Sequence, residues 1–186
     1  MSTTMEIALF DVIAGAAAAE SPVWGDALLP VERRTGEPVF SPLAPDRAQA
    51  LGVETIYEGY LVHYGRSRLF APPDADVALL LGDYLYAHGL VHVAATGAVA
   101  AVADLAELIS LCAQCRAEGI DGDAAAWAAT VARLGTGGLE DARAALRDER
   151  DPGPLMLLAR ETNGADAVGR AMALHSRLAG GAEPSA

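Results

Sequence analysis

The stretch that decides the fold reads Asp-Val-Ala-Leu-Leu-Leu-Gly-Asp-Tyr-Leu-Tyr-Ala-His-Gly-Leu-Val-His-Val-Ala-Ala and runs from Asp76 to Ala95. It is apolar around nearly its whole circumference, which is typical of a central buried helix. One acid, Asp83, stands in its interior. A buried carboxylate costs several kcal/mol unless it is paired or neutralised. We therefore expect this helix at the centre of the fold and a specific partner for Asp83.

The rest of the chain indicates an all-α protein. Its 186 residues are 52% hydrophobic and only 5% aromatic, a mixture that favours closely packed helices over sheets. Prolines punctuate a long loop over residues 21–45. The expected helices cover about residues 3–20, 45–64, 76–95, 98–118, 123–134, 139–150, 154–162 and 165–178. We predict a helical bundle that forms a single domain over residues 1–179, followed by a flexible tail over 180–186.

The charge of the chain argues against nucleic acid as a partner. Its formal net charge is -12, and all 13 basic residues are arginines. Affinity for nucleic acid comes mainly from cations that neutralise phosphates, and in this chain acidic residues outnumber the basic ones. The absence of lysine also removes Schiff-base chemistry.

No segment predicts a membrane span or an export signal. The apolar run over residues 7–19 contains Asp11 and is too short to cross a bilayer. The longer run over 76–95 holds Asp83, His88 and His92, so we interpret it as a core helix. Two cysteines without an export signal indicate a reducing compartment, and we expect a cytoplasmic protein.

Two helices of about twenty residues, joined only by Thr96 and Gly97, predict an antiparallel hairpin. In such a hairpin Asp83 lies level with about Ser110, which could be its partner. Gly82 and Gly89 share one stripe and could let another helix approach closely. The expected structural core of the long helix is Gly82, Asp83, Tyr84 and Gly89.

A metal site is conceivable on the same hairpin. His88 and His92 have the spacing of a helical metal pair, and Cys112 and Cys115 lie on the neighbouring helix. However, His92 and Cys115 would lie about 20 Å apart along the axis, so one site cannot hold all four. We interpret the cysteines as core residues and retain His88 and His92 as the candidate metal ligands.

Two further sets of charged residues remain open. Glu54 and Glu58 share a helix face, and without a third ligand they are predicted to be solvated. Arg66 and Arg68 could bind a phosphate or diphosphate, or could belong to a solvated turn. No P-loop, dinucleotide fingerprint, zinc-protease motif or nucleophile elbow occurs in the sequence.

Leu80-Leu81-Gly82-Asp83-Tyr84-Leu85-Tyr86-Ala87 is similar to the L-x-G-D-x-L-x-A segment of trans-isoprenyl diphosphate synthases, the polyprenyl synthetase family. Arg66 and Arg68 lie where that family carries an arginine pair, and Ile109 to Gly119 resembles the end of its following helix. The resemblance covers about residues 54–119. It implies part of the isoprenoid synthase fold and marks Arg66 and Arg68 as candidate diphosphate ligands.

The chain departs from this family where catalysis is concerned. The family binds magnesium and the allylic diphosphate through two D-D-x-x-D motifs, and the first lies just before the arginine pair. Here that place reads Ile56 to Leu61 with one acid, Glu58, and the C-terminal half that carries the second motif is missing. Without magnesium to neutralise a departing diphosphate, catalysis by this chain alone is not expected.

The chain therefore resembles a non-catalytic subunit, such as the small subunit of heteromeric heptaprenyl diphosphate synthase. The resemblance implies a homodimer, or a heteromer with a catalytic prenyl synthase subunit. It implies no cofactor of the chain's own, with magnesium bound only through the catalytic partner. The alternative is a helical small-molecule or metal-binding module that uses His88 and His92.

Overall fold

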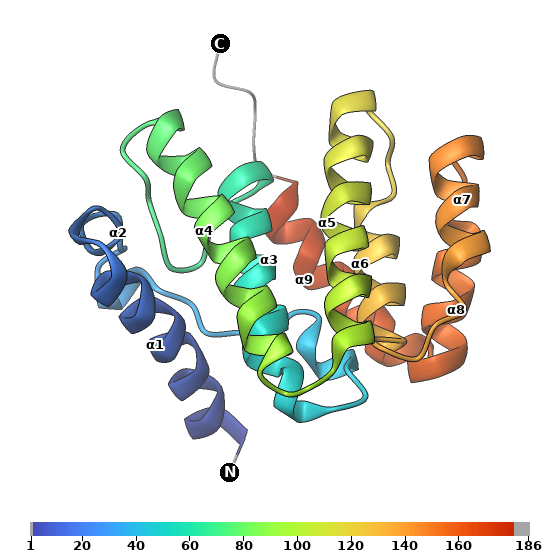
Figure 1. Ribbon diagram of the computed structural model, residues 1–186, viewed down its shortest axis with the longest axis horizontal. Helices are drawn as coiled ribbons and strands as arrows, with labels where there is room; N and C mark the ends of the chain where they lie inside the picture. Colours follow the sequence, from blue (N-terminus) through green and yellow to red (C-terminus); the bar gives the residue numbers. More distant parts are fainter. Residues whose placement is uncertain (1, 181–186) are drawn as a thin grey trace.

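The computed structural model describes the backbone of residues 2–180 and the side chains of residues 9–180. This part of the chain forms nine α-helices and no strand, which confirms the predicted all-α helical bundle (Figure 1). The predicted tail beyond residue 180 lies outside the described residues. The helices are α1 (Ser2–Glu20), α2 (Pro22–Asp26), α3 (Ala50–Tyr64), α4 (Ala75–Ala94), α5 (Val99–Glu118), α6 (Asp123–Ala132), α7 (Glu140–Glu149), α8 (Gly153–Asn163) and α9 (Ala165–Ala179).

Short polar side chains and glycines set the helix ends. The Asp74 carboxylate accepts a hydrogen bond from the N–H of Val77 at 2.8 Å and so caps the start of α4. Gly119 ends α5 with a φ of 63°, in the left-handed region that favours glycine. Because these signals are local, the predicted boundaries of α4 and α5 agree with the structure to within about two residues.

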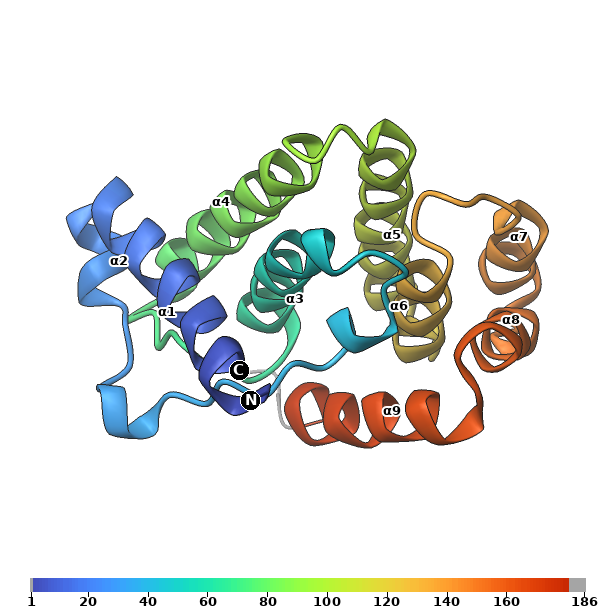
Figure 2. The ribbon, with the colours of Figure 1, turned by 90° about the horizontal axis from the view of Figure 1, so that it is seen from below.

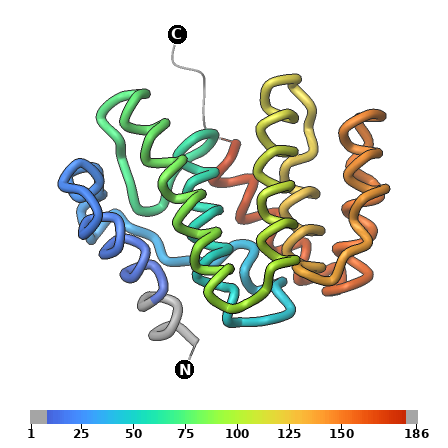
Figure 3. The backbone as a smooth tube through the Cα atoms, viewed as in Figure 1, coloured from blue at the N-terminus to red at the C-terminus, as the bar shows by residue number. Residues whose placement is uncertain are grey.

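The helices are arranged around two inner ones. Seen from below, α3 and α6 lie inside, with α4 and α5 on one side and α9 on the other (Figure 2). Helices α1 and α2 lie at one end of the molecule, and α7 and α8 lie at the opposite end (Figures 1 and 3). The long loop between α2 and α3 contains three short 3-10 turns.

The central helix is α3 and not α4, so this part of the sequence interpretation was wrong. Every residue of α3 from Gly52 to Leu61 is buried, including Glu54 and Glu58. In α4 only 28% of the most apolar window is buried, and Leu80 keeps 59% of its surface exposed. Among the described helices, α4 is the one long and apolar enough to cross a membrane. Helices of soluble proteins can also meet these two criteria.

Four glycines let α3 and α4 pack closely. A Cβ on Gly52 would lie 2.8 Å from the carbonyl oxygen of Gly89, and a Cβ on Gly89 would lie 2.8 Å from that of Gly52. A Cβ on Gly59 would lie 2.9 Å from the carbonyl oxygen of Gly82. The earlier glycine of α3, Gly52, meets the later glycine of α4, Gly89, and the later one, Gly59, meets the earlier one, Gly82. The two helices are therefore antiparallel. The prediction that Gly82 and Gly89 permit close helix approach is confirmed.

The predicted hairpin of α4 and α5 is therefore only partly correct. The helices are consecutive and joined by a short turn, but they diverge from it (Figure 2). The main partner of α4 is α3, and the main contacts of α5 include α6. The glycine-lined contact of α4 with α3 is more extensive than its contact with α5, the next helix in the chain. Proximity in the chain therefore does not decide which helix α4 packs against.

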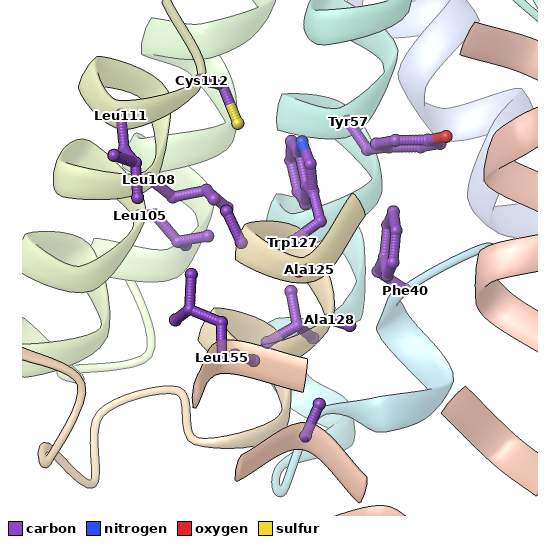
Figure 4. Packing of buried hydrophobic residues seen from close by; sticks show 14 of the residues in the cluster. Phe40, Tyr57, Leu105, Leu108, Leu111, Cys112, Ala125, Trp127, Ala128 and Leu155 are labelled. Carbon is purple, nitrogen blue, oxygen red and sulfur yellow. The ribbon is translucent and has the colours of Figure 1, made fainter. Parts of the chain in front are cut away.

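Aromatic rings fill the centre of the bundle between α3, α6 and the long loop. The Trp127 ring of α6 stacks on Phe40 with centroids 5.5 Å apart and meets the edge of Tyr57 at 5.0 Å. Figure 4 shows Trp127 between Cys112 of α5 and Tyr57 of α3. These residues belong to the larger of two hydrophobic clusters, and burying them supplies much of the driving force for folding.

Candidate functional sites

The most tightly organised charged group is a buried cluster of two acids and one arginine. The Nη1 atom of Arg68 lies 2.8 Å from Glu54 Oε2, and its Nε atom lies 2.9 Å from Glu58 Oε2. Both glutamates are fully buried, and Arg68 is 2% exposed. The prediction that the two acids are solvated was wrong, because their partner comes ten or more residues later in the chain.

The same cluster holds two loop segments against α3. Glu58 Oε1 accepts hydrogen bonds from the backbone N–H groups of Arg68 and Leu69, at 2.8 and 3.0 Å, and from the Ser67 hydroxyl. Glu54 Oε1 accepts hydrogen bonds from the N–H groups of Val39 and Ser41, both at 3.0 Å. The carboxylates thus replace water for backbone donors that would otherwise be buried without partners.

The guanidinium of Arg68 is enclosed on its faces as well. Its carbon lies 4.6 Å from the centre of the Phe10 ring and 5.1 Å from that of Tyr57. Burial lowers the pKa of Arg68, but the carboxylates of Glu54 and Glu58 outweigh burial and raise it overall. The charge of Arg68 is therefore neutralised within the protein, and its role is to pair with these acids.

Arg66, the other candidate diphosphate ligand, lies beside a hollow of about 520 Å³. Its side chain is exposed, and its backbone N–H donates to the carbonyl of Leu178 at 2.8 Å. Arg33 and Thr35 from the long loop also line this hollow. The sequence analysis missed these two residues, because they stand about thirty positions before Arg66 in the proline-rich loop and no local pattern links them to it. The hollow brings Arg66 together with Arg33, while the charged group of Arg68 is bound to the acids.

Asp83 is not the buried acid that the sequence suggests. Its side chain is 65% exposed, and Oδ1 lies 3.3 Å from Nε2 of His63 on α3. Among the described residues its partner is His63 and not Ser110, and both Asp83 and Ser110 are exposed. Tyr84, the next expected core residue, is half-buried and stacks on Trp24 with ring centroids 6.0 Å apart. Of the four expected core residues, Gly82 and Gly89 lie in the core.

His88 and His92 are neighbours, but their geometry provides two ligands at most. Their ring centroids lie 4.4 Å apart at an angle of 83°, so the edge of one ring meets the face of the other. Burial and the nearby His88 lower the pKa of His92. Among the residues that the structure describes, no group of three or more histidine, cysteine or acidic side chains could hold a metal ion. A helical zinc site needs three or four such ligands.

A second polar network, which the sequence did not reveal, joins α3 to α5 and α6. The Tyr60 hydroxyl donates to Asp123 Oδ2 at 2.6 Å, and Arg116 donates to both of these side chains at 2.5 Å. Tyr57 of α3 bonds Nδ1 of His175 on α9 at 3.0 Å. Burial lowers the pKa of His175 to about 4, so this ring is neutral at pH 7. A hollow of about 570 Å³ lies beside Asp123 and His175.

Cys112 and Cys115 are core residues, as the sequence interpretation held. Both are free and buried. Burial raises the pKa of Cys115 to about 11 and raises that of Cys112 well above its ordinary value. Because the thiolate is the reactive form, these thiols are inert at neutral pH.

Helices α4 and α5 keep several apolar side chains exposed to solvent. We call the exposed surface of these two helices the outer face. On α4 its largest side chains are Leu79, Leu80 and Val91, which are 55%, 59% and 63% exposed. On α5 it begins with Val99, at 79% exposure, and continues as a stripe of small exposed residues. That stripe consists of Ala100, Ala103, Ala106, Ser110, Ala113 and Ala117.

The comparisons with known proteins give no relative from which a function could be carried over. No protein-family model, curated protein or solved structure matches the chain. The function must therefore be argued from the sites themselves and from the short resemblance in the sequence.

Proposed function

We propose that this protein is a non-catalytic, prenyl-synthase-like helical subunit that supports a catalytic polyprenyl diphosphate synthase. The observation that carries the proposal is the closed cluster of Glu54, Arg68 and Glu58. Glu58 stands where the resembling family has its first magnesium-binding motif. Here its carboxylate is fully buried and accepts hydrogen bonds from the Ser67 hydroxyl and from backbone and side-chain groups of Arg68.

Such a carboxylate is not available to a metal ion. Magnesium requires near-octahedral oxygen ligands, keeps several waters and needs access to the diphosphate. Opening the cluster would leave Arg68 or one of the glutamates buried without a partner, which costs several kcal/mol. In the proposed complex, magnesium is bound by the catalytic subunit and this chain contributes none of the ligands.

The arginines support the same conclusion. In the proposed role Arg68 stabilises the fold and does not bind diphosphate, because its charge is matched by Glu54 and Glu58. Arg66 remains exposed beside the hollow that Arg33 also lines. Without metal, two exposed arginines give weak affinity for a diphosphate because exposed charges are screened by water and salt.

A supporting subunit must act through protein contact, and the exposed apolar side chains of the outer face suit such a role. A membrane surface is a poorer partner, since a chain with a net charge of -12 and no lysine is repelled by anionic lipids. The proposed setting is the cytoplasm, where the buried thiols of Cys112 and Cys115 stay reduced.

The experiment is an assay of prenyl product with purified protein, magnesium, and allylic and homoallylic diphosphates. We expect no product from the chain alone, and increased product when it is added to a catalytic subunit that co-purifies with it from the native host. Glu58→Gln, assayed alone in the same way, is the control for residual chemistry at this site. Product formed by the chain unaided would refute the proposal.

A further inference from the structure

The second hollow, of about 570 Å³, lies where the ends of three helices meet. Helix α5 is followed by Gly119, α6 begins at Asp123 and α9 is followed by Gly180, and all three residues line the space. Its lining also contains apolar side chains, of which Ile120 is buried and Met172 is half-buried. The hollow is separate from the buried acid cluster of α3 and from the exposed arginines, so neither accounts for it.

His175 brings an unpartnered hydrogen-bond donor to this hollow. The residue lines the space but is only 5% exposed, and its Nδ1 atom is bound to the Tyr57 hydroxyl at 3.0 Å. Tyr57 is fully buried and has no other hydrogen-bond partner among the described residues, so its O–H donates to Nδ1. The neutral ring of His175 therefore carries its proton on Nε2, which has no partner in the described part of the chain. A buried donor of this kind requires an acceptor.

Two further groups at the hollow favour a negatively charged ligand. Arg116 donates to the neighbouring network through Nε and Nη2, which leaves its Nη1 atom without a partner among the described residues. At the start of α6, Gly122 offers no side-chain cap, so no side chain described by the structure caps the first N–H groups of this helix, where Ala124 lines the hollow. Together with Nε2 of His175, these donors suit a carboxylate.

Other groups at the same hollow favour a positive charge. Asp121 is exposed there, and the C-terminal ends of α5 and α9 bring the negative ends of their helix dipoles to Gly119 and Gly180. Among the described residues that line the hollow, Arg116 stands against two acids, Asp121 and Asp123, so a simple anion would be repelled. A metal ion lacks a sufficient set of side-chain ligands in the described part of the chain. A ligand that carries both charges satisfies both sets of groups.

We propose that this hollow binds a free α-amino acid with an apolar side chain. The carboxylate of the ligand accepts hydrogen bonds from Nη1 of Arg116, from Nε2 of His175 and from the first turn of α6, and its ammonium group lies near Asp121. Its side chain packs on Ile120 and Met172. The ligand is neutral overall, so it adds no net charge to an acidic protein. This inference goes beyond the proposed function, because an amino acid takes no part in prenyl transfer.

The first test is isothermal titration calorimetry of the purified chain with L-leucine and L-phenylalanine. We expect one site per chain with a dissociation constant below about 1 mM. Isocaproate lacks the ammonium group of leucine, and isoamylamine lacks its carboxylate. Each should bind at least about tenfold more weakly than leucine, because one set of partners stays unused. Absence of binding by both amino acids, or an analogue that binds as tightly as leucine, would overturn the inference.

The second test locates the site with variants. Asp121→Lys reverses the exposed charge that faces the ammonium group, and we expect it to weaken leucine binding at least about tenfold. Asp141→Lys is the matched control, because Asp141 is also an exposed acid but lies on α7 and does not line the hollow. It should bind leucine like wild type. His175→Phe removes the buried donor and should abolish detectable binding, with circular dichroism as the check that it is folded.

The remaining outcomes are equally decisive. Leucine binding that is unchanged in Asp121→Lys, or equally weakened in Asp141→Lys, would overturn the assignment to this hollow. If His175→Phe does not fold, the two aspartate variants decide the question. Prenyl product formed by the chain unaided would refute the proposed function and would leave the amino-acid site intact. Conversely, a chain that supports a catalytic subunit but binds neither amino acid would refute this inference alone.

Discussion

Helices α3 and α4 lie against each other, yet they use opposite means of fitting into the protein. The sequence of α4 is almost entirely apolar, but Leu79, Leu80 and Val91 remain exposed. The sequence of α3 carries Glu54 and Glu58, but its residues from Gly52 to Leu61 are all buried. The difference teaches that the hydrophobicity of a helix does not by itself decide how deeply the helix is buried. Its burial depends on partners for its polar groups and on the number of helices that pack around it.

The comparison also separates two functions of the fold. Helix α3 is enclosed by α4, α6, α9 and the loops, and its polar side chains tie those parts together. Helix α4 uses its glycine face for α3 and leaves apolar side chains such as Leu80 and Val91 exposed. The following changes test this separation, from the largest expected effect to the smallest.

Replacing Arg68 by methionine should have the largest effect. The change leaves Glu54 and Glu58 buried without a cation, and breaking such a cluster costs about 3–5 kcal/mol of unfolding free energy. Urea denaturation at one fixed protein concentration measures the loss. Arg66→Met is the control, because Arg66 is exposed, and should stay within about 0.5 kcal/mol of wild type. Equal losses in the two variants would show that the cluster does not stabilise the core.

Acid should weaken the contact between α3 and α9 through His175. Burial lowers the pKa of this side chain from 6.5 to about 4 in the folded protein, so the unfolded chain binds the proton more tightly. Its stabilising contribution is fully present above pH 6.5 and is lost as the pH falls towards 4. Between pH 7 and about pH 4.5 this loss amounts to about 2.5 kcal/mol.

Urea denaturation across that range, compared with a His175→Asn variant, isolates the contribution of this histidine. The variant lacks the titrating ring, so its unfolding free energy should depend less steeply on pH in this range. Identical pH dependence in both proteins would contradict a neutral, buried His175.

Adding a methyl group at Gly89 should separate α3 from α4. The Cβ would lie 2.5 Å from Cγ1 of Ile56 and 2.8 Å from the carbonyl oxygen of Gly52, so the helices must move apart. We expect Gly89→Ala to lose about 1–3 kcal/mol of unfolding free energy. Gly169→Ala is the matched control, because no atom lies within 4 Å of its Cβ. It should gain about 0.5 kcal/mol, and a similar gain at Gly89 would refute the close packing.

The parts of the fold that depend on local signals could be predicted from the sequence. Helix ends at Asp74 and Gly119 follow from capping and left-handed backbone, which neighbouring residues determine. The stripe of Gly82 and Gly89 was also visible, since helical periodicity places both on one face. The helix that packs on this stripe could not be predicted, because Gly52 and Gly59 lie on α3, which a loop separates from α4.

The charged clusters could not be predicted, because they depend on distant parts of the chain. Glu54 and Glu58 resemble a solvated pair until Arg68 and the loop backbone fold over them. Asp83 looks like a buried acid in the sequence because its helix is apolar. Its side chain is exposed because a different face of α4 packs against α3. His175 meets Tyr57 across more than a hundred residues, and no periodicity in the sequence signals this contact.

The most direct test of the contrast between α3 and α4 is to remove one charge from each helix. Glu58→Gln removes a buried carboxylate from α3, and Asp83→Asn removes one that is 65% exposed from α4. Their unfolding free energies are measured side by side by urea denaturation at the same protein concentration. We predict a loss of about 3 kcal/mol for Glu58→Gln and a change within about 0.5 kcal/mol for Asp83→Asn. The reverse order, or equal losses, would contradict the assignment of α3 as the buried polar core.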